Sequence, residues 1–219
     1  MRREENILNG ELTPLQYIES VGNAWINTGF TPNQDTRVVC EFMIAQLPPE
    51  WANGARDENV ISVPFGSRYD FMTQSFTTYL PANSASARII SYGSNGQFVA
   101  TQDSNQVNVR FKIDADKNVW KTYKNDSLVS TKNFSKYNFT CPYPMLLFNT
   151  LSYSTLSGEH DTILGPSTGQ IRMYLCDIYD NGTQVRQYRP YLNGGGAGML
   201  DEINNVWYGN QGTGYFLYN

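Results

Sequence analysis

Apolar and polar residues alternate in short runs along most of the chain, and this alternation is its main structural signal. The clearest run covers residues 106–113, in which every second side chain is apolar: Val107, Val109, Phe111 and Ile113. Successive side chains of a β-strand point to opposite faces of a sheet, so a period of two indicates a strand with one buried face. We therefore predict a strand here, with these four residues facing a core.

A second run, from Asp35 to Gln46, differs because both of its faces are largely apolar. One face carries Val38, Cys40, Phe42 and Ile44, and the other carries Val39, Glu41 and Met43. A strand whose two faces are both apolar is typical of the inside of a protein. The sequence therefore predicts a central strand that is covered on both sides.

Turn signals separate these runs. The strongest is Asn181-Gly182, because Asn and Gly tolerate the positive φ angles of a two-residue hairpin turn. About a dozen short strands follow one another in this way, and no stretch has a convincing period of 3.6, so we predict an all-β sandwich or barrel. The charged and polar residues 1–11 predict an arm or linker, and residues 12–219 predict a single domain.

The composition limits the classes of molecule that the protein could bind. Charged residues make up 16% of the chain, against roughly 25% in ordinary domains. Aromatic residues reach 14%, and 15 of them are tyrosines, which suits contacts with sugars or proteins. The net charge of −4 argues against nucleic acid, since binding there depends on neutralising phosphates. No apolar stretch approaches the roughly 18 residues of a membrane span, and the first residues lack the apolar core of a secretory signal.

Three cysteines are far apart in the sequence: Cys40, Cys141 and Cys176. They show no Cys-x-x-Cys spacing, and a zinc site would need more ligands than a chain with one histidine offers. Either one disulfide forms and leaves a free thiol, or all three are small buried apolar residues. The second interpretation is favoured.

Two segments carry a resemblance to a known family. The opening LTPLQYIESVGNAWINTGFTPNQDTRV and the ending CDIYDNGTQVRQYRPYLNGGGAGMLDEINNVWYGNQGTG resemble the ends of laminin-G-like, concanavalin A-like domains of gut bacteria and their phages. The resemblance implies an antiparallel jelly-roll β-sandwich. Domains of this family serve as sugar binders, adhesion modules, phage appendage parts and, in some relatives, glycanases, so the fold leaves the function open.

The resemblance also implies where catalytic residues would lie. Glycanases with this sandwich carry two or three carboxylates at alternate positions of one strand, where one can act as the acid and another as the nucleophile. Asp177 and Asp180 have the wrong spacing for this, and Asp114 and Asp116 are predicted to lie in a turn. Glu159-His160-Asp161 has no accompanying nucleophile motif. We therefore predict no catalytic residue and a protein that is not an enzyme.

Many laminin-G-like domains hold one Ca²⁺ at a loop rim, so the resemblance makes Ca²⁺ the only cofactor worth testing. The ligands would be Asp114, Asp116 and Asn118, or Asp70. The simpler interpretation makes these residues turn formers that bond their own backbone, and no metal ligand is predicted.

Glycan contacts would come from exposed aromatic residues with polar neighbours. The candidates are Trp51, Asn53, Arg56, Tyr69, Tyr92 and Trp120, and for most of the rings the alternative is packing in the core. We expect a non-catalytic, lectin-like binding or adhesion module on a phage virion or a bacterial cell surface. It would bind glycans of a host surface, dock to other virion proteins through residues 1–11, and form a homo-oligomer such as a trimer. The alternatives are a purely structural virion assembly protein and a glycan-degrading enzyme.

Overall fold

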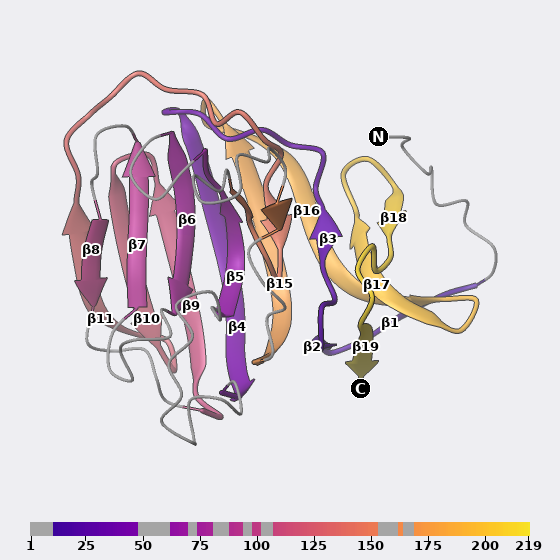
Figure 1. Ribbon diagram of the computed structural model, residues 1–219. Coiled ribbons are helices and arrows are strands. Elements are labelled where there is room, and N and C mark those ends of the chain that lie inside the picture. Colours follow the sequence, from indigo (N-terminus) through magenta and orange to yellow (C-terminus); the bar gives the residue numbers. More distant parts are fainter. Residues whose placement is uncertain are drawn as a thin grey trace.

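The computed structural model describes residues 11–47, 62–69, 74–80, 88–93, 98–101, 107–152, 162–163 and 169–219. Within these ranges the chain contains strands and turns and no helix, and the strands form two stacked sheets (Figure 1). No helix of the described part has the length and apolar character needed to cross a bilayer.

The large sheet has eleven strands and forms the back layer in Figure 1. Its main order is β11-β10-β9-β4-β15-β16-β17-β18. In addition, β1 pairs with β16, β2 pairs with β15, and β19 pairs with β2. The bounds are β1 Leu12–Pro14, β2 Ile18–Val21, β4 Thr36–Gln46, β9 Arg110–Asp116, β10 Val119–Lys124, β11 Ser127–Asn133, β15 Gln170–Asp180, β16 Thr183–Asn193, β17 Gly196–Asp201, β18 Val206–Tyr208 and β19 Tyr215–Tyr218.

The second sheet has six strands in the order β3-β12-β5-β6-β7-β8. Its bounds are β3 Ile26–Asn27, β12 Leu146–Leu147, β5 Ser62–Ser67, β6 Ser75–Leu80, β7 Arg88–Gly93 and β8 Phe98–Thr101; a separate pair joins β13 Leu151–Ser152 to β14 Thr162–Ile163. All of these strand pairs are antiparallel, and β4 lies between β9 and β15, which come much later in the sequence. The predicted all-β jelly-roll sandwich is confirmed.

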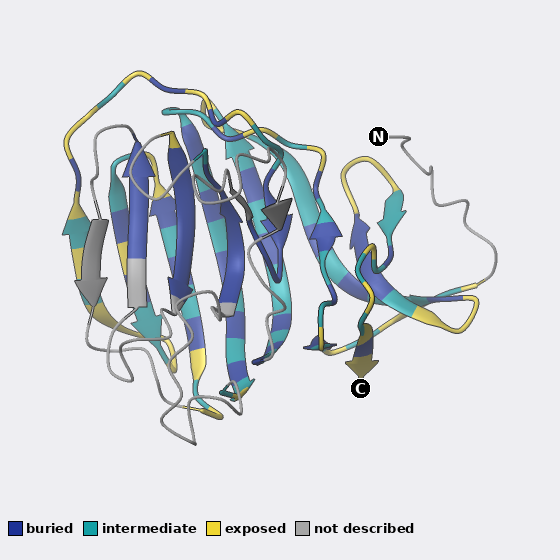
Figure 2. Cartoon of the chain, in the orientation of Figure 1, coloured by how far each residue is buried: buried dark blue, intermediate teal, exposed yellow. Residues whose placement is uncertain are grey.

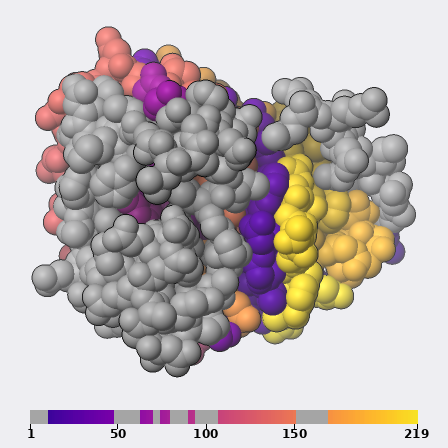
Figure 3. All heavy atoms as spheres, viewed as in Figure 1, coloured from indigo at the N-terminus to yellow at the C-terminus, as the bar shows by residue number. Residues whose placement is uncertain are grey.

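The two ends of the described chain lie side by side. Gln211 and Gly214 donate backbone hydrogen bonds to the carbonyl oxygens of Trp25 and Asn23. Figure 3 shows the C-terminal segment against the N-terminal one. The two sequence segments that carry the family resemblance therefore form one structural unit.

An aromatic cluster fills the space between the sheets. Trp120 of β10 lies at its centre, 5.0 Å from the ring of Phe76 and 6.1 Å from the rings of Phe65 and Phe134, measured between centroids. Its indole nitrogen donates a hydrogen bond of 3.0 Å to the carbonyl oxygen of Lys117. Burial and a satisfied polar atom make this tryptophan a core residue.

The central position of β4 is confirmed, but the predicted cover on both sides is wrong. The face with Cys40 and Ile44 is buried, whereas the other face is only partly buried. That outer face also carries charge, because Arg37 pairs with Asp114 and Glu41 pairs with Arg110. Charged groups stay near water unless burial is fully compensated, so this face is left open to solvent. Figure 2 shows the difference, since β5, β6 and β7 are buried along most of their length while β4 is banded.

The strand predicted at residues 106–113 is shifted toward the C-terminus. Phe111 and Ile113 face the core as predicted, but Val107 is 42% exposed and forms only an isolated bridge to Ile44. Strand β9 continues to Asp116, and the chain turns at Lys117, whose φ is 53°. The acidic pair predicted for a turn therefore lies in a strand.

The hairpin predicted at Asn181-Gly182 is confirmed. It joins β15 to β16, and the two residues have φ angles of 47° and 82°. Positive φ at both central positions is what a type I′ turn requires.

Candidate functional site

The outer face of the six-stranded sheet is polar and buried. Phe76 of β6 and Tyr92 of β7 are directly opposed and face the core. Tyr79 lies three residues after Phe76 on the same strand, so its side chain points to the outer face. Serine and threonine residues share that face: Ser75, Thr77 and Ser91, all buried.

Arg68 and Tyr79 form the chemically distinctive pair on this face. Arg68 directly follows β5, and its guanidinium carbon lies 5.2 Å from the centre of the Tyr79 ring. The two residues are 6% and 3% exposed. A cation over a ring in a place of low exposure interacts more strongly than the same pair in water.

Burial raises the pKa of the Tyr79 phenol to about 12, and the charge and hydrogen bond of Arg68 oppose part of this rise. Desolvation favours the uncharged form of a phenol, while a nearby cation favours the phenolate. At neutral pH the site therefore combines a protonated phenol, which can donate a hydrogen bond or a proton, with a permanent positive charge.

A glycine shapes the strand beside this pair. A Cβ atom on Gly66 would lie 2.1 Å from Oγ1 of Thr77 and 2.9 Å from Oγ1 of Thr150. The two hydroxyl groups therefore meet over a backbone that has no side chain, and any larger residue would displace them. Thr77 also donates a hydrogen bond of 3.3 Å to the carbonyl oxygen of Phe65. The result is a buried layer of hydroxyl groups next to Arg68.

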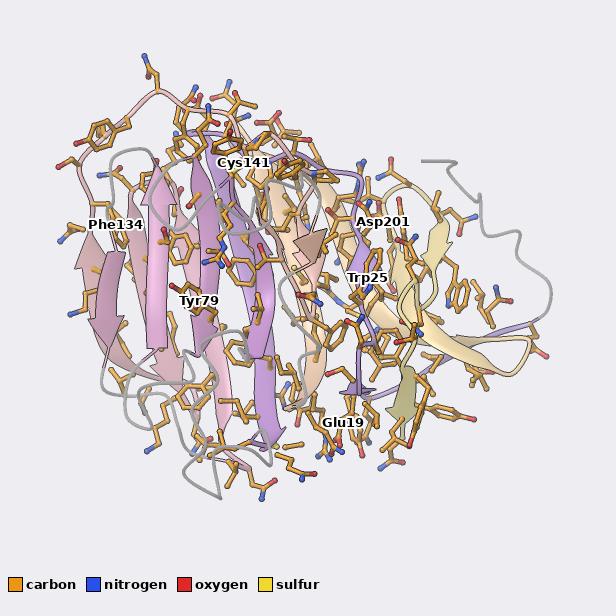
Figure 4. All side chains as sticks on the ribbon, in the orientation of Figure 1. Glu19, Trp25, Tyr79, Phe134, Cys141 and Asp201 are labelled. Atoms are coloured by element: carbon orange, nitrogen blue, oxygen red, sulfur yellow. The ribbon has the colours of Figure 1, made fainter. Side chains whose placement is uncertain are left out.

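The six-stranded sheet differs from the large sheet in its carboxylates. None of the six strands of this sheet contains Asp or Glu. The ion pairs of the described residues lie on the large sheet and its turns. Figure 4 shows Tyr79 well separated from the labelled carboxylates Glu19 and Asp201. Tyr79 of β6 and Arg68, which follows β5, thus offer an acid and a cation, but the strands of this sheet lack the pair of carboxylates on which most glycosidases depend.

Two of the predicted glycan contacts are wrong. Tyr92 is 2% exposed and Trp120 is not exposed at all, and both rings pack in the core cluster between the sheets. Tyr92 also donates a hydrogen bond of 3.3 Å to the carbonyl oxygen of Gln34. Both rings face the core between the two sheets, so neither can meet a sugar at the outer face of the six-stranded sheet.

The remaining predicted contacts are not decided. Tyr69 is partly buried and follows Arg68 directly, so it lies beside the Arg68–Tyr79 pair and stays a prediction. Trp51, Asn53 and Arg56 lie outside the described residues.

Two of the residues considered for calcium, Asp114 and Asn118, have other partners, while Asp116 is exposed at the end of β9. Asp114 accepts two hydrogen bonds of 2.8 and 2.9 Å from Arg37, and the Asn118 amide donates one of 2.9 Å to the carbonyl oxygen of Phe134. Asp70 and residues 159–161 lie outside the described residues. Across the described ranges no group of three or more His, Cys, Asp or Glu side chains could hold a metal ion.

Sequence reasoning did not identify Arg68 as a site residue. A lone arginine at the end of a run of small and apolar residues carries no motif. Its partner Tyr79 is one of 15 tyrosines in the chain, and no motif sets it apart. The register of β5 with β6 is what identifies the pair. Phe65 lies opposite Thr78, and both side chains face the core. Arg68, three positions after Phe65, and Tyr79, one position after Thr78, therefore both point to the outer face.

Comparisons with known proteins give a weak likeness of fold. The sequence matches no protein-family model and no curated protein. Alginate lyase AlgAT5 of polysaccharide lyase family 7 is 15% identical over 66% of this chain and 58% of its own, with a TM-score of 0.35. An alginate lyase from Corynebacterium sp. is 13% identical over 74% of this chain and 61% of its own, with a TM-score of 0.34. A fructosyltransferase from A. japonicus is 11% identical over 81% of this chain and 28% of its own, with a TM-score of 0.38.

These comparisons correct the expected function. The solved structures named above are alginate lyases and a fructosyltransferase rather than virion or adhesion proteins, so the expectation of a non-catalytic, lectin-like module on a virion is withdrawn. The chain spans less than two thirds of each enzyme, and TM-scores below 0.5 carry no argument for a particular activity. The reaction has to be inferred from the chemistry of the site.

Proposed function

We propose that the protein cleaves a polysaccharide at the outer face of the six-stranded sheet. In this proposal Tyr79 donates the proton to the departing sugar oxygen and Arg68 stabilises negative charge. The observation that carries the proposal is the Arg68–Tyr79 pair beside a layer of hydroxyl groups on the outer side of the sheet.

The chemistry of the pair favours elimination over hydrolysis. Hydrolysis by most glycosidases needs two carboxylates, and the strands of this sheet have none. Elimination acts on a sugar that bears a carboxylate. Solvent water takes the proton from the carbon next to that carboxylate, the bond to the departing oxygen breaks, and a carbon–carbon double bond forms. The departing oxygen takes its proton from Tyr79, and solvent returns a proton to the phenol. A guanidinium can hold the substrate carboxylate and stabilise the charge that develops on it, while a protonated phenol supplies the proton for the departing oxygen.

The substrate class is then a polysaccharide that contains uronic acids. Two of the similar solved structures are named as alginate lyases, which agrees with this class without establishing it. Guanidinium groups bind carboxylates with two parallel hydrogen bonds, so a uronate fits Arg68 better than a neutral sugar does.

The test is a panel of acidic and neutral polysaccharides incubated with the protein. Two products are measured: new reducing ends, which any cleavage gives, and the ultraviolet absorbance of the unsaturated sugar, which only elimination gives. We expect both signals with a uronate polymer and neither with neutral glucans.

A matched pair of variants assigns the role of Tyr79. Tyr79→Phe should lower the turnover roughly 10²–10⁴-fold, the usual contribution of general acid catalysis. Tyr92→Phe is the control, because Tyr92 is equally buried in the same sheet and its pKa is also raised to about 12, but it faces the core. Reducing ends without the absorbance signal, or equal activity in the two variants, would refute the proposed role.

A further inference from the structure

Two buried cysteines face each other across the two central strands of the large sheet. Cys40 of β4 is the register partner of Cys176 of β15. Both thiols are free and completely buried. A disulfide between these two cysteines would link β4 to β15 in the middle of the large sheet.

The hydrogen-bond pattern shows that Cys40 and Cys176 form a non-hydrogen-bonded pair, the kind in which opposed side chains lie closer together. Opposed residues in antiparallel strands alternate between hydrogen-bonded pairs and non-hydrogen-bonded pairs, and side chains are closer in the second kind. Asn181 donates its backbone N–H to the carbonyl oxygen of Asp35, which makes that position a hydrogen-bonded pair. The pairing continues without a register shift to Cys40, five positions along β4. An odd number of steps makes Cys40 and Cys176 a non-hydrogen-bonded pair.

The geometry of such a pair suits a disulfide. Its Cα atoms are about 4.5 Å apart. Disulfides span Cα separations of about 4.4–6.8 Å. Cys141 has a different setting, because its thiol lies against the carbonyl oxygen of Ser67 at 3.8 Å.

We infer that Cys40 and Cys176 form a disulfide when the chain folds in the presence of a low-molecular-weight disulfide, and that the folded sandwich then preserves whichever redox state it folded in. In the first step one thiolate attacks a sulfur of glutathione disulfide, which gives a mixed disulfide and releases one glutathione thiolate. The second cysteine thiolate attacks the mixed disulfide and releases the other glutathione. The two cysteines lose two electrons, glutathione disulfide gains them, and the two protons end on the glutathione thiols.

Preservation follows from burial. Exchange needs an accessible thiolate. Neither sulfur is exposed, and burial with the neighbouring thiol raises the pKa of Cys40. The bond therefore forms in the unfolded or partly folded chain and persists after folding.

The test compares two refolded samples of the whole chain. Reduced protein is unfolded in denaturant and diluted into either reduced glutathione or glutathione disulfide. Each sample is then unfolded without reductant, alkylated and weighed by mass spectrometry. We expect three alkylated thiols after folding with reduced glutathione and one after folding with glutathione disulfide, together with a higher denaturation midpoint for the oxidised sample.

Variants identify the bonded pair. Cys141→Ala should still lose both remaining thiols on oxidative folding. Cys40→Ala and Cys176→Ala, which place a small apolar side chain at a buried site, should each keep both. Three alkylated thiols in the oxidised wild-type chain, or loss of thiols in Cys40→Ala, would overturn the inference.

A further incubation tests preservation. Folded, reduced protein is exposed to glutathione disulfide without denaturant and should keep its three thiols. Loss of two thiols under these conditions would show that the folded sandwich does not protect the pair.

Discussion

Replacement of Trp120 by alanine tests whether this ring belongs to the core. The side chain is fully buried, and complete truncation of a buried aromatic residue costs about 3–5 kcal/mol. Trp120 contacts the rings of Phe65, Phe76, Tyr92 and Phe134, and each aromatic pair adds roughly 0.5–1.5 kcal/mol beyond the buried area. We therefore expect a loss at the upper end of the range, about 5 kcal/mol.

A loss of this size is easy to measure. In a chain of 219 residues each kcal/mol lowers the melting temperature by about 2–4 °C, so the variant should melt about 10–20 °C below the wild type. Urea unfolding followed by far-ultraviolet circular dichroism gives the free energy directly. Trp120→Phe keeps a ring but loses the hydrogen bond to Lys117, so its stability should fall between those of the wild type and the alanine variant.

The neighbouring residue provides the control. Lys121 is exposed on the same strand, and Lys121→Ala should change the free energy of unfolding by less than about 0.5 kcal/mol. A Trp120→Ala variant that is as stable as Lys121→Ala would refute the core assignment and restore an exposed, ligand-facing role for the ring.

Three other perturbations have definite expected outcomes. Gly198→Ala places a Cβ 2.3 Å from the carbonyl oxygen of Tyr208 and should cost about 1–3 kcal/mol in urea unfolding, whereas Gly196→Ala meets only ordinary contacts and should cost less than 1 kcal/mol. The folded-state pKa of Tyr79 is about 12 against 10 for a free phenol, so the stability due to this group is complete below pH 10 and is lost as pH rises toward 12. Unfolding free energies across that range should fall less steeply in Tyr79→Phe. Asp201→Asn weakens a buried acceptor of two backbone amides and should lower stability by about 1.5–3 kcal/mol, which calorimetry can detect.

The strand content of the fold is predictable because its causes are local. A period of two at Phe111 and Ile113 and the Asn181-Gly182 turn depend only on neighbouring residues, and both predictions are confirmed. The burial of Trp120 was not predictable in the same way. Val119 and Trp120 are consecutive and both apolar, so alternation alone cannot decide which of them faces the core. The pairing of β10 with β9 and β11 decides it, and Val119 takes the outer face.

The candidate site depends on contacts that are still less local. Arg68 and Tyr79 are eleven positions apart, and the polar face between them exists only because β5 and β6 pair in a particular register. A shift of one residue would move Tyr79 into the core. Thr150 reaches the same face from a distant part of the chain. No short-range pattern contains this information, so the alternation of residues does not single out Arg68 and Tyr79.

The charge distribution explains why an acidic glycan would favour the smaller sheet. The five arginines on the strands of the large sheet, Arg37, Arg110, Arg172, Arg186 and Arg189, each pair with a carboxylate. Two of them also stack on tyrosine rings at 4.0 Å. A polyanion that approached this face would meet the carboxylates as well as the cations, and would have to break existing pairs to gain new ones. The strands of the six-stranded sheet contain no Asp or Glu, so a uronate approaching them meets no strand-borne carboxylate.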